Sequence, residues 1–266
     1  MYTLSDCSGN IACEATSALF DYDVLASVVI STTSFMFVSL IFFVFEKFST
    51  LKRFRAQPYK PNDGQLTNYE WWIAFRVSMR NLLVVQWPVT VLTSWYHRRV
   101  SGYGTSLSPM IVLFELAFCI LFVEIWFYFS HRMLHRHWWF TRVHKQHHRF
   151  TYPSAICALH THWFEFIFSN QLGVALGPVL IGCHLYVRCA WIAIALASTA
   201  ISHSGFVGYA MQHDLHHEFF RCNYGVLGLC DWLFKTDSFA AGFIDVKTDA
   251  LRRYRHNRCG EQVDEL

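Results

Sequence analysis

The chain has 266 residues, of which 53% are hydrophobic and 15% are charged, and its formal net charge at pH 7 is +3. This hydrophobic content is high for a soluble domain, and so small a net charge excludes the strongly basic surface of a nucleic-acid-binding protein. We therefore expect an integral membrane protein that binds no nucleic acid.

The first apolar segment extends from Val24 to Phe45 and contains no charged residue over 22 positions, which is long enough for a helix to cross a bilayer. Acidic residues precede it and basic residues follow it, so the positive-inside rule places the N-terminus in the lumen and residue 50 in the cytosol. We divide this region into a lumenal tail (1–23), a transmembrane anchor (24–48) and a cytosolic linker (49–70). A disulfide between Cys7 and Cys13 of the lumenal tail is a candidate, whereas the other cysteines are expected to be free thiols.

The second apolar run, residues 81–96, is short and contains Pro88, and it is followed by His97, Arg98 and Arg99. These features favour a kinked or re-entrant helix over a full crossing. The run from Met110 to Ser130 is long enough to span the membrane. Two further segments, 164–182 and 185–201, predict a helical hairpin that enters the membrane and returns.

Three histidine motifs lie between and after these apolar segments: HRMLH (His131, His135), HKQHH (His144, His147, His148) and HDLHH (His213, His216, His217). Residues three and four apart share one face of a helix, so each motif directs imidazoles toward one place. Eight imidazoles are too many for one metal ion and predict two, of a kind that imidazole prefers, such as iron or zinc. Because the hairpin returns the chain to the same side, we expect an all-α membrane bundle with a dimetal site on its cytosolic face. Its catalytic domain would span 71–245, and residues 246–266 would form a basic cytosolic tail.

These motifs and their surroundings resemble the fatty acid hydroxylase and sterol desaturase superfamily of integral-membrane diiron oxygenases, over about residues 126–237. The resemblance rests on HKQHHRFTYPSA (144–155), HWFE (162–165), ISHSGF (201–206) and HDLHHEFFRCNYGVLGLCDWLFKTD (213–237). Trp163 replaces the proline of the family's HPxE pattern. Within the superfamily the chain looks most similar to fatty-acid-hydroxylase-domain-containing proteins and C4-methylsterol oxidases, and next to cholesterol 25-hydroxylases.

The resemblance implies that His203 is a ninth ligand, that the metals are two iron ions, and that the protein resides in the endoplasmic reticulum membrane. It also implies that NAD(P)H supplies electrons through cytochrome b5 and its reductase. Zinc can occupy such ligands in a purified sample. No oligomeric state is predicted.

Other polar residues are weaker candidates for the same site. His162 is a candidate tenth ligand. Glu124, Glu165 and Asp214 are candidates to accept a hydrogen bond from the second nitrogen of a ligand imidazole. Helix packing explains Glu124 as well. Ordinary helix polarity explains Glu165 and Asp214 as well.

These observations predict a sterol oxygenase that resembles C4-methylsterol oxidase. The alternative enzyme is a hydroxylase or desaturase of a fatty acyl or sphingoid chain. The alternative from another class is a non-catalytic membrane protein that binds a sterol. A two-metal hydrolase is disfavoured, because the motifs lack the aspartates that such enzymes use.

Overall fold

The computed structural model describes residues 21–100 and 107–259. The predicted lumenal tail as far as residue 20, with its candidate Cys7–Cys13 disulfide, and residues 260–266 lie outside these ranges.

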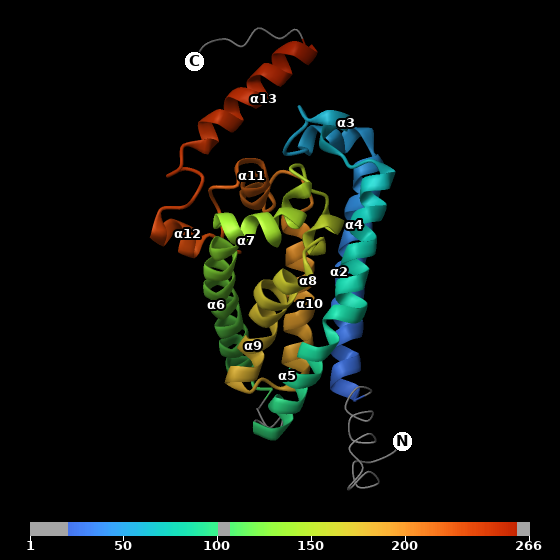
Figure 1. The fold of residues 1–266 in the computed structure, drawn as a ribbon, viewed down its shortest axis with the longest axis vertical. Coiled ribbons are helices and arrows are strands. Elements are labelled where there is room, and N and C mark those ends of the chain that lie inside the picture. The colour runs from blue at the N-terminus through green and yellow to red at the C-terminus, as the bar shows by residue number, and fades with distance from the viewer. Residues whose placement is uncertain (1–20, 101–106, 260–266) are drawn as a thin grey trace.

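Four helical segments in the described part of the chain are long and apolar enough to cross a membrane. They are α2 (Tyr22–Lys47), α6 (Pro109–Leu134), α10 (Leu185–Ser202), and the continuous run of α8 (Trp163–Glu165), η6 (Phe166–Gln171) and α9 (Leu172–Ile181). Figure 1 shows α2, α6 and α10 side by side along the long axis of the molecule. The described residues form helices and one isolated bridge, which confirms the predicted all-α membrane bundle.

A fifth helical path lies beside α2. It consists of α4 (Asn68–Arg80), a π-helical turn η3 (Asn81–Val85) and α5 (Trp87–Val100), and it descends from α3 (Pro61–Gly64) to the opposite end of the bundle (Figure 1). Pro88 is the second residue of α5, where its missing N–H is not needed by the helix. The expected re-entrant segment is therefore the lower half of a path that extends along the whole bundle.

The basic residues after this segment face the start of α2. Nη1 of Arg98 lies 2.5 Å from an Asp21 carboxylate oxygen and 2.9 Å from one of Asp23. Nε2 of His97 lies 2.9 Å from the carbonyl oxygen of Cys183, in the turn between α9 and α10. The positive charge at the end predicted to be lumenal is thus paired with the acidic residues that precede the first span.

The predicted linker packs against the bundle. It contains η2 (Ser49–Phe54) and α3, and Arg55 between them is buried. Nη1 of Arg55 donates to Oε1 of Glu46 (3.2 Å) and to the carbonyl oxygen of Ser204 (3.0 Å), and Nη2 donates to the carbonyl oxygen of Gly64. The segment therefore ties the end of α2 to the loop that follows α10.

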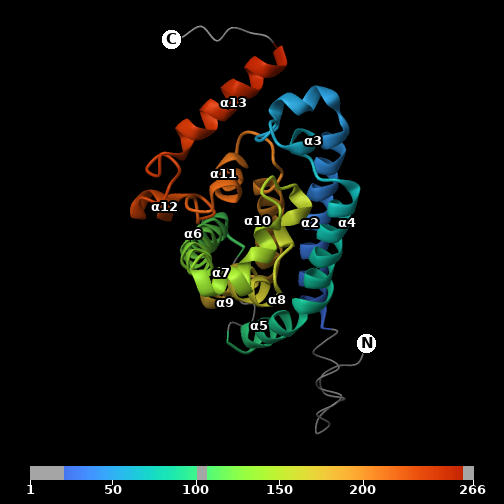
Figure 2. The same cartoon turned by 45° about the horizontal axis from the view of Figure 1, so that its top comes forward.

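The remaining elements gather at the end of the bundle where α2 finishes (Figures 1 and 2). They are α7 (His137–Arg142), η4 (His144–Arg149), η5 (Ala155–Leu159), α11 (Met211–Phe219), α12 (Leu229–Phe234) and α13 (Phe243–Cys259). The expected tail from residue 246 thus continues helix α13 as far as residue 259. Nζ of Lys247 is buried against α11, 3.0 Å from Oδ2 of Asp214 and 2.8 Å from Oε2 of Glu218.

We expect Lys247→Met to lower the unfolding temperature of the purified protein, because the change leaves the buried Asp214 carboxylate without its cation. Breaking a buried ion pair by removing one partner costs about 3 kcal/mol or more. Thermal unfolding in detergent checks this. Thr248→Ala, at the exposed neighbouring position of α13, is the control and should leave the transition unchanged. Equal transitions for Lys247→Met and wild type would show that α13 contributes no stability.

Candidate metal centre

Nine histidines converge in two adjoining groups at the end of the bundle. The first group is His131, His135, His144, His148 and His216, and the second is His147, His203, His213 and His217. Within each group every residue offers a ring nitrogen, and these nitrogens all lie within 4.8 Å of one another. The eight clustered histidines and His203 are thus all brought together, in the two groups that a dimetal site requires.

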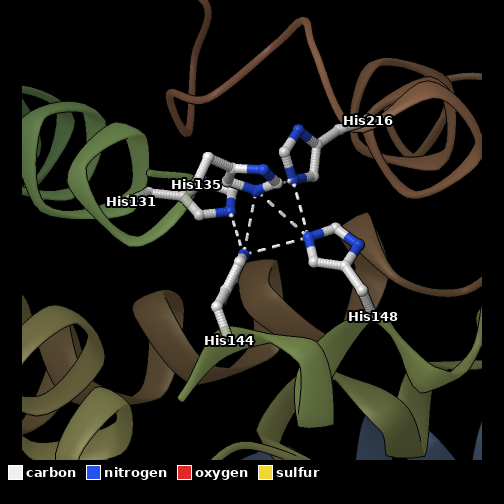
Figure 3. Close-up of side chains that lie close together, drawn as sticks. All are labelled: His131, His135, His144, His148 and His216. Carbon is white, nitrogen blue, oxygen red and sulfur yellow. Dashed lines mark hydrogen bonds between the residues drawn. The ribbon is translucent and has the colours of Figure 1, made fainter. Parts of the chain in front are cut away.

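Figure 3 shows the ring nitrogens of the first group pointing at one another. Nε2 of His144 lies 2.9 Å from Nε2 of both His135 and His148, and 3.1 Å from Nε2 of His131. Nε2 of His216 lies 3.1 Å from the same atom of His135 and of His148. Five imidazoles from α6, η4 and α11 therefore surround one point.

The ring nitrogens of the second group also lie close together. Nε2 of His203, at the C-terminal end of α10, lies 2.9 Å from Nε2 of His213 and 3.3 Å from Nε2 of His147. Nε2 of His217 is buried and has no hydrogen-bond partner. A buried nitrogen left in this state is costly unless a cation takes its lone pair.

The two HxxHH motifs each serve both groups. In η4, His144 and His148 join the first group and His147 joins the second, whereas in α11 His213 and His217 join the second and His216 joins the first. Adjacent residues of a helix point in directions about 100° apart, so a His-His pair cannot bind one ion from the same side. Each pair diverges between two centres, and the shared backbone keeps those centres close together.

Backbone carbonyls fix the protonation of several rings. The Nδ1 atoms of His131, His216, His217 and His203 donate to the carbonyl oxygens of Tyr224 (2.8 Å), Cys222 (2.7 Å), Phe150 (3.0 Å) and Thr199 (2.9 Å). A carbonyl oxygen only accepts, so the proton of each neutral ring resides on Nδ1 and Nε2 presents a lone pair. Lone pairs that converge repel one another, and this donor set therefore fits metal cations at the two points of convergence.

Burial keeps the ligands neutral, which is the state that binds a metal ion. It holds the pKa far below the usual histidine value for His144, His147, His148, His213, His216 and His217, and the neighbouring imidazoles lower it further. For His203, burial lowers the pKa to about 4. His135 is the one ligand that is partly exposed.

Of the three acidic candidates, Glu165 is the one that contacts a ligand imidazole. Its Oε1 lies 2.9 Å from Nδ1 of His144, and both side chains are buried. Its place at the start of the α8–α9 run explains the HWFE motif, because the helix holds the carboxylate directly behind η4. The carboxylate therefore lies close enough to orient His144, and we propose that it does so.

Glu124 and Asp214 differ from the expectation that they would contact imidazoles. Glu124 accepts hydrogen bonds from the backbone N–H groups of Val226 (2.8 Å), Leu227 (2.7 Å) and Cys230 (2.9 Å). It thereby fixes the turn that carries the carbonyl of Tyr224. Asp214 binds Lys247 and accepts a 3.2 Å hydrogen bond from Nε2 of Gln57.

His162 lies outside both groups and caps α8, where its Nδ1 accepts from the backbone N–H of Phe164 at 3.2 Å. His160 also lies outside both groups. It is buried, and its Nδ1 lies 3.0 Å from the carbonyl oxygen of Gln146 in η4. It supports the histidine-bearing turn, and no motif in the sequence marks it.

A cavity of about 270 Å³ reaches both groups from within the bundle. His131, His147, His203 and His213 line one end of it. Its walls are mainly side chains of α6, α9 and α10, such as Val123, Phe127, Val174, Trp191 and Ala195. An apolar molecule in this cavity would lie against the histidine centre.

Comparison with known proteins agrees with these features. The family model described as "Fatty acid hydroxylase" matches residues 116–236. "Fatty acid hydroxylase domain-containing protein 2" of Homo sapiens is 42% identical over 130 residues, 47% of this chain and 39% of that protein. "Fatty acid hydroxylase ahd1" of Mycosarcoma maydis is 32% identical over 197 residues, 71% of this chain and 50% of that protein.

A third relative, "Methylsterol monooxygenase 1" of Danio rerio, is 28% identical over 212 residues, 74% of this chain and 71% of that protein. The chain thus spans less than two thirds of the first two relatives but more of the third. No solved structure matches the chain.

We expect the purified protein to hold two metal ions per chain and each group to lose its ion independently. His216→Ala should deplete the first group and His213→Ala the second, so each variant should retain about one ion. His162→Ala is the control and should retain both. Elemental analysis of the monodisperse fraction measures this. Loss of metal from His162→Ala, or full retention in His213→Ala, would contradict the two groups.

Removing the carboxylate behind His144 tests its orienting role. Partners that orient a ligand imidazole typically contribute about ten- to hundredfold in metal affinity, and we expect Glu165→Ala to weaken the first ion by that factor. Titration with a competing chelator gives the affinity. Asp245→Ala, at an exposed acidic position of α13, should leave it unchanged. An affinity unaffected by Glu165→Ala would remove the carboxylate from the metal centre.

Proposed function

We propose that this protein is a membrane-bound diiron oxygenase that oxidises a lipid, since residues 116–236 match the family model described as fatty acid hydroxylase. The single observation that carries the proposal is the placement of two groups of neutral imidazoles at one end of an apolar cavity. A buried metal centre whose main cavity is lined mostly by apolar side chains suits oxidation of a C–H bond better than hydrolysis, which needs water.

The donor set supports iron. Neither group in the described part of the chain contains a carboxylate, which disfavours magnesium and calcium and the usual two-metal hydrolases. Bound iron would activate dioxygen and supply the oxidising power that an unactivated C–H bond requires. One oxygen atom would enter that bond, and the other would leave as water with two electrons and two protons from outside.

The protein's own residues would hold the metals and orient the rings that bind them. The imidazoles would bind the metals through uncharged nitrogen atoms. Glu165 and the four carbonyls fix the orientation of the rings. Phe127, Val174 and Trp191 keep water from the substrate side. Nothing in this arrangement abstracts a proton from carbon, because no side chain is basic enough to do so.

A sterol is the substrate class that we propose first. Two relatives named as methylsterol monooxygenases align over more than 70% of both chains. Their name indicates that the substrate is a sterol with a methyl group. In a C4-methylsterol this methyl group is on the carbon next to the one that bears the hydroxyl group. A fatty acyl or sphingoid chain is the second class, supported by the relative named fatty acid hydroxylase ahd1. The end of the cavity away from the histidines influences which position of the lipid is oxidised.

Electrons would enter beside His135. A side opening at this ligand is lined by Arg132, Met133 and Arg136, and both arginines are exposed. An acidic carrier such as cytochrome b5, reduced by NAD(P)H through its reductase, fits such a basic rim. Lys47 and Lys52 lie at the same end of the bundle, which supports a cytosolic orientation of this face in the endoplasmic reticulum membrane.

The test is reconstitution of the full chain in lipid nanodiscs with iron, NADPH, cytochrome b5 and reductase under ¹⁸O₂. We expect a lipid product that carries one ¹⁸O atom, and we expect His216→Ala to abolish it. The panel contains a 4-methylsterol, cholesterol and fatty acyl and sphingoid lipids. Absence of product across the panel, with two irons bound per chain, would favour a sterol-binding protein without catalytic activity.

A further inference from the structure

The cavity has a second polar end, opposite the histidines. Ser27, Thr93 and Arg188 line it there, whereas most of the side chains between this end and the histidines are apolar. Arg188 lies on α10 fifteen residues before His203 (203 − 188), a separation of about 22 Å along the helix. That length is of the order of a whole sterol.

Arg188 is buried, with 4% of its surface exposed, and its hydrogen bonds are incomplete. Nη2 donates to Oγ of Ser27 (2.9 Å) and Oγ of Ser94 (2.6 Å). Nη1 is also buried and has no hydrogen-bond partner among residues 21–100 and 107–259. An unsatisfied guanidinium nitrogen inside a membrane bundle is costly, so a hydrogen-bond acceptor from a ligand would offset that cost.

Among the described residues, the charges that adjoin Arg188 already balance one another. Arg188 lies within electrostatic range of Asp23, and Arg98 pairs with both Asp21 and Asp23. Two carboxylates and two guanidinium groups sum to zero. An added carboxylate would therefore create an excess negative charge, and a neutral acceptor fits this end better.

An unsatisfied acceptor lies about one helical turn nearer to the histidines. Gln171 lines the cavity, and its Nε2 donates to the carbonyl oxygen of Gln86 (2.6 Å) and to Oγ1 of Thr90 (3.1 Å). Its Oε1 is buried and has no hydrogen-bond partner in the described part of the chain. Thr90, which Gln171 contacts, lies one turn of α5 before Ser94, which Arg188 contacts. Gln171 and Arg188 are therefore about one helical turn apart along the cavity. A hydroxyl group both accepts and donates, and so suits an end that offers a free donor and a free acceptor.

We infer that this end binds the hydroxyl group of a lipid, with Arg188 as the donor to its oxygen. The inference rests on the proposed lipid-oxygenase function and deepens it. The lipid then lies along the cavity with its hydroxyl group at Arg188 and its apolar end at the histidines. For a sterol this orientation places the 3-hydroxyl group and C4 far from the metals, and it moves the oxidised position to the hydrocarbon tail.

The test is equilibrium binding to the full chain in phosphatidylcholine nanodiscs, which needs no turnover. Cholesterol is compared with its 3-deoxy analogue, and the ratio of the two affinities is taken for each variant, so that an inactive fraction cancels. A hydrogen bond to a charged donor supports a preference of about tenfold or more for cholesterol in the wild type. Arg188→Met should reduce that ratio to about one by weakening cholesterol alone.

Three further variants complete the design. Arg188→Lys retains a cationic donor and should keep part of the preference, and Gln171→Leu should reduce it by a smaller factor. Arg99→Met makes the same chemical change at an exposed position outside the cavity and should leave the ratio intact. If Arg188→Met does not fold, Arg188→Lys and Gln171→Leu still decide the outcome.

Equal weakening of both sterols by Arg188→Met would overturn the inference and leave Arg188 a structural residue. Stronger dependence on Arg188 for oleic acid than for oleyl alcohol and cholesterol would overturn the assignment of a neutral hydroxyl group. Hydroxyl-dependent binding without any oxidised product would uphold the inference and refute the oxygenase function. Product formed at C4 of a bound methylsterol would refute the orientation and uphold the oxygenase.

Discussion

The structure depends on the convergence of nine imidazole nitrogens whose lone pairs face one another. Left alone, such a cluster would push its helices apart, since the rings are neutral and several carry their proton on the outer nitrogen. Carbonyls from three separate segments hold the outer nitrogens of four rings. The end of the bundle is therefore organised to present lone pairs inward, and two cations are the species that turn this repulsion into attraction.

Residues outside the two groups stabilise the same arrangement indirectly, by fixing the segments around the histidines. Glu124 fixes the turn whose Tyr224 carbonyl holds His131, and Arg55 ties α2 to the loop after His203. Lys247 clamps α13 onto α11. Because the ligands are neutral, the charge of the metals is not compensated by the groups that bind them. We expect such a shell to raise the reduction potential above that of carboxylate-rich centres.

The sequence predicted well which histidines lie together, because histidines at helical spacing have few other uses in an apolar chain. It did not predict how they divide, since the split of each His-His pair depends on how η4 and α11 face each other. Glu124 was placed near the site, but its partners are backbone N–H groups, which no residue pattern reveals. For residues 81–96 the sequence predicts a kinked or re-entrant helix. It could not predict the pairing of Arg98 with Asp21 and Asp23, because this pairing joins residues that are far apart in sequence.

X-ray absorption at the iron edge of the iron-loaded full chain tests the central claim most directly. The account predicts a first shell that nitrogen dominates, outer-shell scattering from imidazole rings, and a second iron nearby. A single isolated iron, or a shell with sulfur or mainly carboxylate oxygen, would contradict it.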